Sequence, residues 1–119
     1  MTGKEYLQAV EQSIIDDKKI KSIYQKYTDQ LPDLLKKIVC YCDSSVFLDD
    51  ETRILSFAEI ADADKELHVQ FAQLGILPIA DCGDNDFIVY DYKNSDWAKF
   101  NIVDKTLFKK RATLAELLL

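Results

Sequence analysis

Residues 76–91 read Ile76-Leu77-Pro78-Ile79-Ala80-Asp81-Cys82-Gly83-Asp84-Asn85-Asp86-Phe87-Ile88-Val89-Tyr90-Asp91. The apolar run 76–80 predicts a strand, with Pro78 at an edge of the sheet or in the strand's first turn. Residues 81–86 are rich in Asp, Asn and Gly, which indicates a solvated turn in which Gly83 takes a positive φ. The run 87–90 is apolar on both faces and predicts a central strand. This stretch therefore predicts an antiparallel hairpin at the middle of a sheet.

The pattern continues downstream of this hairpin. A turn at 94–95 leads into a further strand over 97–103, where apolar and polar residues alternate. Thr113 can cap a closing helix over 114–118. The hairpin and this strand together predict an antiparallel meander followed by a helix.

A helix is predicted immediately upstream of the meander. Ser56 and Glu59 form a capping-box pattern, in which each side chain can bond the other residue's amide. Gly75 stands where a left-handed cap would end the helix. The apolar face of this predicted helix comprises Phe57, Ile60, Leu67, Phe71 and Leu74.

The first half of the chain predicts helices followed by a short β pair. Residues 1–29 predict two helices or one kinked helix, with a break near Asp16 and Asp17, either of which can cap the second. A third helix starts at Leu31-Pro32, because proline suits a first helical turn. Short strands at 46–48 and 53–55 enclose an acidic corner.

This order predicts the α+β class, with helices packed against a mostly antiparallel sheet. The chain has 119 residues, of which 48% are hydrophobic, and this size suits one domain with one core. We expect residues 1–119 to form that domain, with an N-terminal helical segment at 1–29 and a core at 30–118.

Charge narrows the classes of partner. The net charge is −6 and the pI is about 4.7, which argues against nucleic acid and against an anionic membrane surface. A basic protein suits this charge, although many acidic domains are merely soluble. The basic residues Lys105, Lys109, Lys110 and Arg111 are too few to reverse the balance. An odd number of cysteines (three) and the lack of an apolar signal or spanning segment indicate the cytoplasm.

Catalytic and metal chemistry find little support in the sequence. On a helix, Cys40 and Cys42 point about 200° apart, so they cannot chelate one ion. A site joining Cys42, Cys82 and His68 is geometrically open, but paired-ligand spacing is lacking, and we expect His68 to be partly buried.

The sequence supports a calcium site or a catalytic carboxylate pair no better. The turn at 81–86 fails the calcium-loop pattern in both reading frames, and the carboxylate pairs fall in turns or on a polar helix face. We therefore expect no cofactor and no enzyme. A small hydrolase or metal-dependent enzyme remains the alternative from another class.

Residues 76–91 also resemble the central hairpin of the SUKH superfamily. The resemblance rests on the apolar-Pro-apolar strand, the Gly-containing turn and the apolar strand that closes on Asp91. Leu31-Pro32, residues 53–60 and residues 113–118 are similar to further segments of that family. The likeness extends over about residues 30–118.

This resemblance implies a protein-binding module without enzymatic activity. Most bacterial members are similar to immunity proteins that occlude a polymorphic toxin, and others to regulators of cell-wall assembly. We expect an immunity protein against a toxin domain such as a basic nuclease; the alternative is a regulatory or scaffold protein with an endogenous partner.

We expect the binding face to lie between two acidic turns, with aromatic anchors beside them. The aromatic residues are Tyr92 and Trp97, and the alternative for Trp97 is a position in the core. The acidic residues are Asp49, Asp50, Glu51, Asp81, Asp84 and Asp86.

Overall fold

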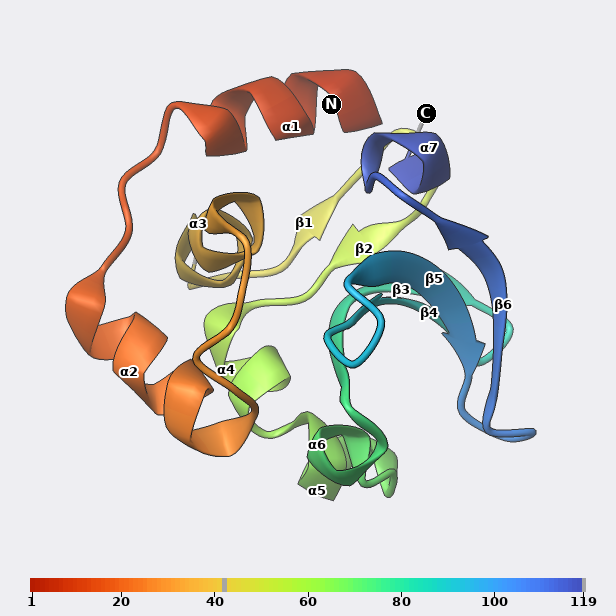
Figure 1. Ribbon diagram of the computed structural model, residues 1–119. Helices are drawn as coiled ribbons and strands as arrows, with labels where there is room; N and C mark the ends of the chain where they lie inside the picture. The colour runs from red at the N-terminus through yellow and green to blue at the C-terminus, as the bar shows by residue number, and fades with distance from the viewer. Residues whose placement is uncertain (42, 119) are drawn as a thin grey trace.

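The computed structural model describes residues 1–41 and 43–118, which form seven helices and one six-stranded sheet (Figure 1). The helices are α1 (Gly3–Glu11), α2 (Asp17–Lys26), α3 (Asp33–Tyr41), α4 (Phe57–Ala61), α5 (Ala63–Leu67), α6 (Phe71–Leu74) and α7 (Ala115–Leu118). The strands are β1 (Val46–Phe47), β2 (Arg53–Ile54), β3 (Ile76–Gly83), β4 (Asp86–Asp91), β5 (Asp96–Asn101) and β6 (Thr106–Arg111).

The sheet follows the order of the chain. Its strands run β1-β2-β3-β4-β5-β6, and each is antiparallel to the next. Residues 87–91 of β4 are all buried, which confirms the predicted central strand. The predicted α+β class is confirmed.

Pro78 lies on β3, an inner strand of the sheet rather than an edge strand, at a point beyond the ladder between β2 and β3. The ladder between β2 and β3 covers only Ala80 and Asp81, while Pro78 pairs in register with Val89 of β4. Proline has no backbone N–H, but at this position no bond to β2 is lost because of it.

The β3–β4 turn is tighter than the sequence predicts. Strand β3 continues to Gly83, which pairs with Asp86, so only Asp84 and Asn85 connect the strands. Both have positive φ values, 54° and 66°, as a two-residue hairpin of type I′ requires. Gly83 has φ 85°, so its predicted positive φ is confirmed.

Residues 56–74 form three short helices, and the prediction of one long helix is wrong. The chain leaves helical geometry at His68, which has φ 56° and ends α5. Asp64 Oδ1 accepts a bond from the Phe71 amide at 2.9 Å. This bond gives an acceptor to one of the amides at the start of α6 that have no partner within the helix. Gly75 caps α6 with φ 79°, as predicted.

The basic residues before α7 lie on a strand that the sequence analysis missed. Lys109, Lys110 and Arg111 belong to β6, at the edge of the sheet, and Lys109 has φ 51°. Charged side chains and irregular backbone are common on edge strands because they discourage pairing with other chains.

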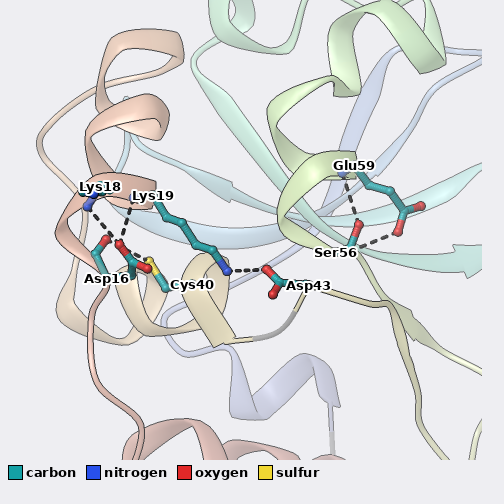
Figure 2. Close-up of polar contacts among 7 residues, drawn as sticks. All are labelled: Asp16, Lys18, Lys19, Cys40, Asp43, Ser56 and Glu59. Atoms are coloured by element: carbon teal, nitrogen blue, oxygen red, sulfur yellow. Dashed lines mark hydrogen bonds and ion pairs between the residues drawn. The ribbon is translucent and has the colours of Figure 1, made fainter.

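The N-terminal segment packs into the same core as the sheet. Two residues each from α1 and α2 join the buried cluster: Tyr6, Val10, Ile20 and Ile23. Helix α1 packs on α3 and α7, and α2 packs on α3 and α4, as Figure 1 shows. Asp16 caps α2 through its Oδ1, which accepts bonds from the amides of Lys18 and Lys19 (Figure 2).

The described helices are all short. Over residues 1–41 and 43–118, none has both the length and the apolar character needed to cross a membrane.

Candidate protein-binding surface

Three turns meet at one end of the sheet. They are the β1–β2 turn at 48–52, which lies beside α7 at the top of Figure 1, and the β3–β4 turn at 84–85 and the β5–β6 turn at 102–105, which lie on its right. The register places them together: Arg53 faces Asp81, Asp86 faces Asn101, and Asn101 faces Thr106. We call this region the acidic end, because it carries Asp49, Asp50, Glu51, Asp81, Asp84, Asp86 and Asp104.

Local hydrogen bonds hold these turns in place. Asp50 Oδ1 accepts from the Thr52 amide at 3.0 Å, and Asp81 Oδ1 accepts from the Gly83 amide at 2.9 Å. Asp86 Oδ1 accepts from Asn101 Nδ2 at 2.8 Å, which ties β4 to β5. The carboxylates therefore sit on a defined backbone.

The cations of the acidic end offset only part of this charge, and one of them is Lys105, which is exposed in the β5–β6 turn. The amino group of Met1 lies 2.7 Å from Asp49 Oδ1, and Arg53 Nη2 lies 3.6 Å from Asp81 Oδ2. Within the described residues, Asp50, Glu51 and Asp84 form no ion pair, and all three are exposed. The acidic end therefore has a net negative charge that faces solvent.

A pocket of about 320 Å³ adjoins the acidic end. Helices α4 and α5 form one wall, and residues of β2, β3 and β4 contribute the rest. Its apolar lining is Leu55, Ala58, Ala63, Leu67 and Phe87, and its charged lining is Arg53, Glu59, Asp62, Glu66 and Asp81. We call it the α4–α5 pocket. Asp81 belongs to both the pocket and the acidic end, so the two are continuous.

Arg53 already neutralises two carboxylates of the pocket. Its Nη1 lies 2.5 Å from Glu59 Oε2, and its Nη2 reaches Asp81. Glu59 also accepts from the Ser56 amide at 3.0 Å, and Ser56 Oγ accepts from the Glu59 amide at 3.3 Å, which confirms the predicted capping box (Figure 2). Burial alone would raise the pKa of Glu59, but the bonds from Ser56 and Arg53 lower it below the usual value.

Asp62 and Glu66 are the unpaired carboxylates of the pocket. Both are exposed, and neither side chain has an ion pair or hydrogen bond in the part of the chain that the structure describes. The sequence analysis did not single out this pocket. Its signal was the spacing of Glu59, Asp62 and Glu66 by three and four residues, which would place these acids on one face of the single helix predicted there.

The aromatic anchors are not where we expected them. Trp97 is 5% exposed and packs on Tyr90 with ring centroids 4.9 Å apart, so it is a core residue. Tyr92 is half-buried, and its hydroxyl donates to the Ala72 carbonyl at 2.8 Å. Both belong to the β4–β5 hairpin, whose turn lies at the opposite end of the sheet from the acidic end, because successive turns of a meander alternate between ends.

The candidate metal ligands do not form a site in the structure as described. His68 is exposed at the end of α5 rather than partly buried, and Cys42 lies outside the described residues. Over residues 1–41 and 43–118, no three His, Cys, Asp or Glu side chains are grouped to hold a metal ion. Burial raises the pKa of the Cys40 and Cys82 thiols, which favours their neutral form.

Comparisons with known proteins found no relative: no family model, no curated protein and no solved structure matches this chain. The resemblance to the SUKH superfamily therefore stays a prediction.

Proposed function

We propose that this protein is a binding module without enzymatic activity, and that its acidic end docks on a basic protein. The observation that carries the proposal is the convergence of three turns, with seven carboxylates, at one end of the sheet. A patch of one sign raises the rate of encounter with a partner of the opposite sign. Because the turns are held by hydrogen bonds, little backbone entropy is lost when a partner binds.

The class of partner comes from the resemblance to the SUKH superfamily. We propose a cytoplasmic immunity role, in which the protein covers a toxin domain such as a basic nuclease. A regulatory role with an endogenous partner uses the same surface, so only the identity of the partner separates the two.

The first experiment identifies the partner and measures neutralisation. Tagged protein is mixed with the product of the large gene next to its own in the host genome, and the toxicity of that product is measured with and without it. One stoichiometric complex with loss of toxicity supports the immunity role. Indifference to that product, with stoichiometric capture of a host protein instead, supports the regulatory role.

The second experiment locates the surface. The neutralised variant Asp50→Asn/Asp84→Asn/Asp86→Asn keeps the hydrogen-bond acceptors of the turns but removes three charges. We expect its association rate to fall by about tenfold or more at low salt, and its salt dependence to weaken. The control variant Glu11→Gln/Asp29→Asn/Asp33→Asn removes three exposed charges far from the acidic end and should bind at the wild-type rate. Equal association rates for all three proteins would contradict this placement.

A further inference from the structure

We infer that the α4–α5 pocket receives an arginine side chain from the basic partner. The inference rests on the proposed function for the source of that arginine, whereas the chemistry of the pocket stands on the structure alone. The arginine would lay its methylene stem against the apolar lining and place its guanidinium between Asp62 and Glu66.

The apolar part of the pocket fits the stem. Leu55 and Phe87 come from the sheet side, and Ala58, Ala63 and Leu67 come from the helices. Arginine and lysine bury their methylene groups against such surface while their charged ends stay near water. At about 320 Å³ the pocket is at the small end of the range for ligand sites, roughly 300–1,000 Å³, which suits one long side chain.

The charged part of the pocket can accept a further cation. Four carboxylates line it (Glu59, Asp62, Glu66 and Asp81), and Arg53 supplies the one positive charge among the lining residues. Arg53 is engaged with Glu59 and Asp81, so Asp62 and Glu66 have no charged partner among the described residues. The net charge of the lining is therefore −3, and the two unpaired carboxylates lie at its helical wall.

The fit favours arginine over other cations. A guanidinium carries five donors in a planar fork and can bridge two carboxylates, while an ammonium acts as a compact point charge. Arg53 already shows this geometry inside the pocket, where its two terminal nitrogens contact different carboxylates.

The position of the pocket makes it part of the same docking surface. Asp81 lines the pocket and also belongs to the acidic end, so one partner can contact both. The acidic end would then mainly set the rate of encounter, and the pocket would slow dissociation. These roles are separable because exposed rim charges act on association, whereas anchored side chains act on dissociation.

A probe experiment tests the pocket without the partner. N-acetyl-arginine amide is titrated into the full protein while the backbone amides of Ala58, Ala63 and Leu67 are followed by NMR. We expect saturable shifts that N-acetyl-citrulline amide, which is similar in shape but uncharged, produces at least about tenfold more weakly. Absence of saturable shifts, or equal affinity for N-acetyl-lysine amide, would overturn the assignment to arginine.

The variant Asp62→Asn/Glu66→Gln removes the two carboxylates that would hold the guanidinium. Neither carboxylate makes a hydrogen bond in the described structure, so the fold should be unaffected. We expect the affinity for the arginine probe to fall by about tenfold or more, and the variant Glu11→Gln/Asp29→Asn to bind it as the wild type does. Unchanged probe affinity in Asp62→Asn/Glu66→Gln would also overturn the inference.

The same variant separates this inference from the proposed function. With the partner, Asp62→Asn/Glu66→Gln should mainly dissociate faster, and its association rate should fall less than that of the variant of the acidic end. If the dissociation rate is unchanged while the acidic-end variant still associates slowly, the pocket inference fails and the docking proposal stands. If the probe binds but no basic protein does, the docking proposal fails and the pocket stands as an arginine site.

Discussion

Glu59 connects a helix cap, a strand and a pocket. Its side chain accepts a bond from the Ser56 amide at the start of α4 (Figure 2) and pairs with Arg53 in β2, so one carboxylate fixes the position of α4 relative to the sheet. Its pKa is lowered because these bonds outweigh the effect of burial. A lowered pKa in the folded state means that the ionised side chain stabilises the fold.

This linkage predicts how Glu59→Gln responds to pH. The contribution of Glu59 is fully present above the usual glutamate value of 4.5 and is lost as the pH falls through the lower pKa of the folded state. The variant should therefore be less stable near neutral pH, by about 1 kcal/mol or less because the pair is partly exposed. The difference from the wild type should shrink below about pH 4.5.

Urea unfolding at several pH values measures this difference. Glu66→Gln is the control, since it removes an exposed carboxylate of the same pocket that has no hydrogen bond in the described structure. A constant difference between Glu59→Gln and the wild type from pH 7 to pH 3 would contradict the linkage.

For single residues, the sequence predicts hydrogen-bond partners that are near in the chain well and distant ones poorly. The cap at Ser56 was predicted, and Asp16 was one of two candidates for the cap of α2, because donor and acceptor lie within a few residues of each other. The bond between Arg53 and Glu59 was not, because it depends on how β2 is placed against α4. Trp97 illustrates the same limit, since a tryptophan near a turn looks the same in sequence whether it is buried or exposed.

Among the helices and strands, the segment 56–74 shows most clearly where prediction from sequence patterns fails. Its apolar spacing fits one helix, and no Gly or Pro interrupts it. The structure nevertheless breaks it at Asp62 and again at His68, where a left-handed residue lets Val69 and Phe71 turn into the core. Tertiary burial therefore overrides local propensity here. Strand β6 was missed for the opposite reason, because its edge position needs few apolar residues.

The break at His68 predicts a stabilising substitution. A residue other than glycine loses roughly 1 kcal/mol in a left-handed conformation, so His68→Gly should raise the free energy of unfolding by about that amount. His68→Ala keeps the penalty and should show no such gain. Gln73→Gly, within α6, should instead destabilise by roughly 0.5–1 kcal/mol. Chemical denaturation distinguishes the three, and a loss of stability in His68→Gly would show that the imidazole makes contacts that matter.

Over the whole molecule, α1 and α7 join the two ends of the described chain. Gly3 lies so close to α7 that a Cβ placed on it would come within 2.4 Å of the Leu118 carbonyl oxygen. Helix α1 also buries Tyr6 and Val10 completely. The segment 1–29 is therefore a structural part of the core that supports the sheet.

This contact predicts that Gly3→Ala destabilises the protein, although alanine is the better helix former. Helix propensity alone favours alanine by up to about 1 kcal/mol. The clash with backbone must move α1 or α7, and overpacking of this kind costs roughly 1–3 kcal/mol. We expect a net loss in thermal and chemical denaturation. Gln8→Ala, at an exposed position of the same helix, is the control, and a net gain for Gly3→Ala would show that α1 can shift freely.

The chain-order sheet has a consequence for folding speed. Because β3, β4 and β5 each pair with the next strand along the chain, hairpins can form one after another across short loops. The contact between Gly3 and Leu118 closes a loop of almost the whole chain, so it should form late. The transition state for folding should therefore contain the meander before α1 docks. Substitutions at the α1–α7 contact would then speed unfolding and leave the folding rate nearly unchanged.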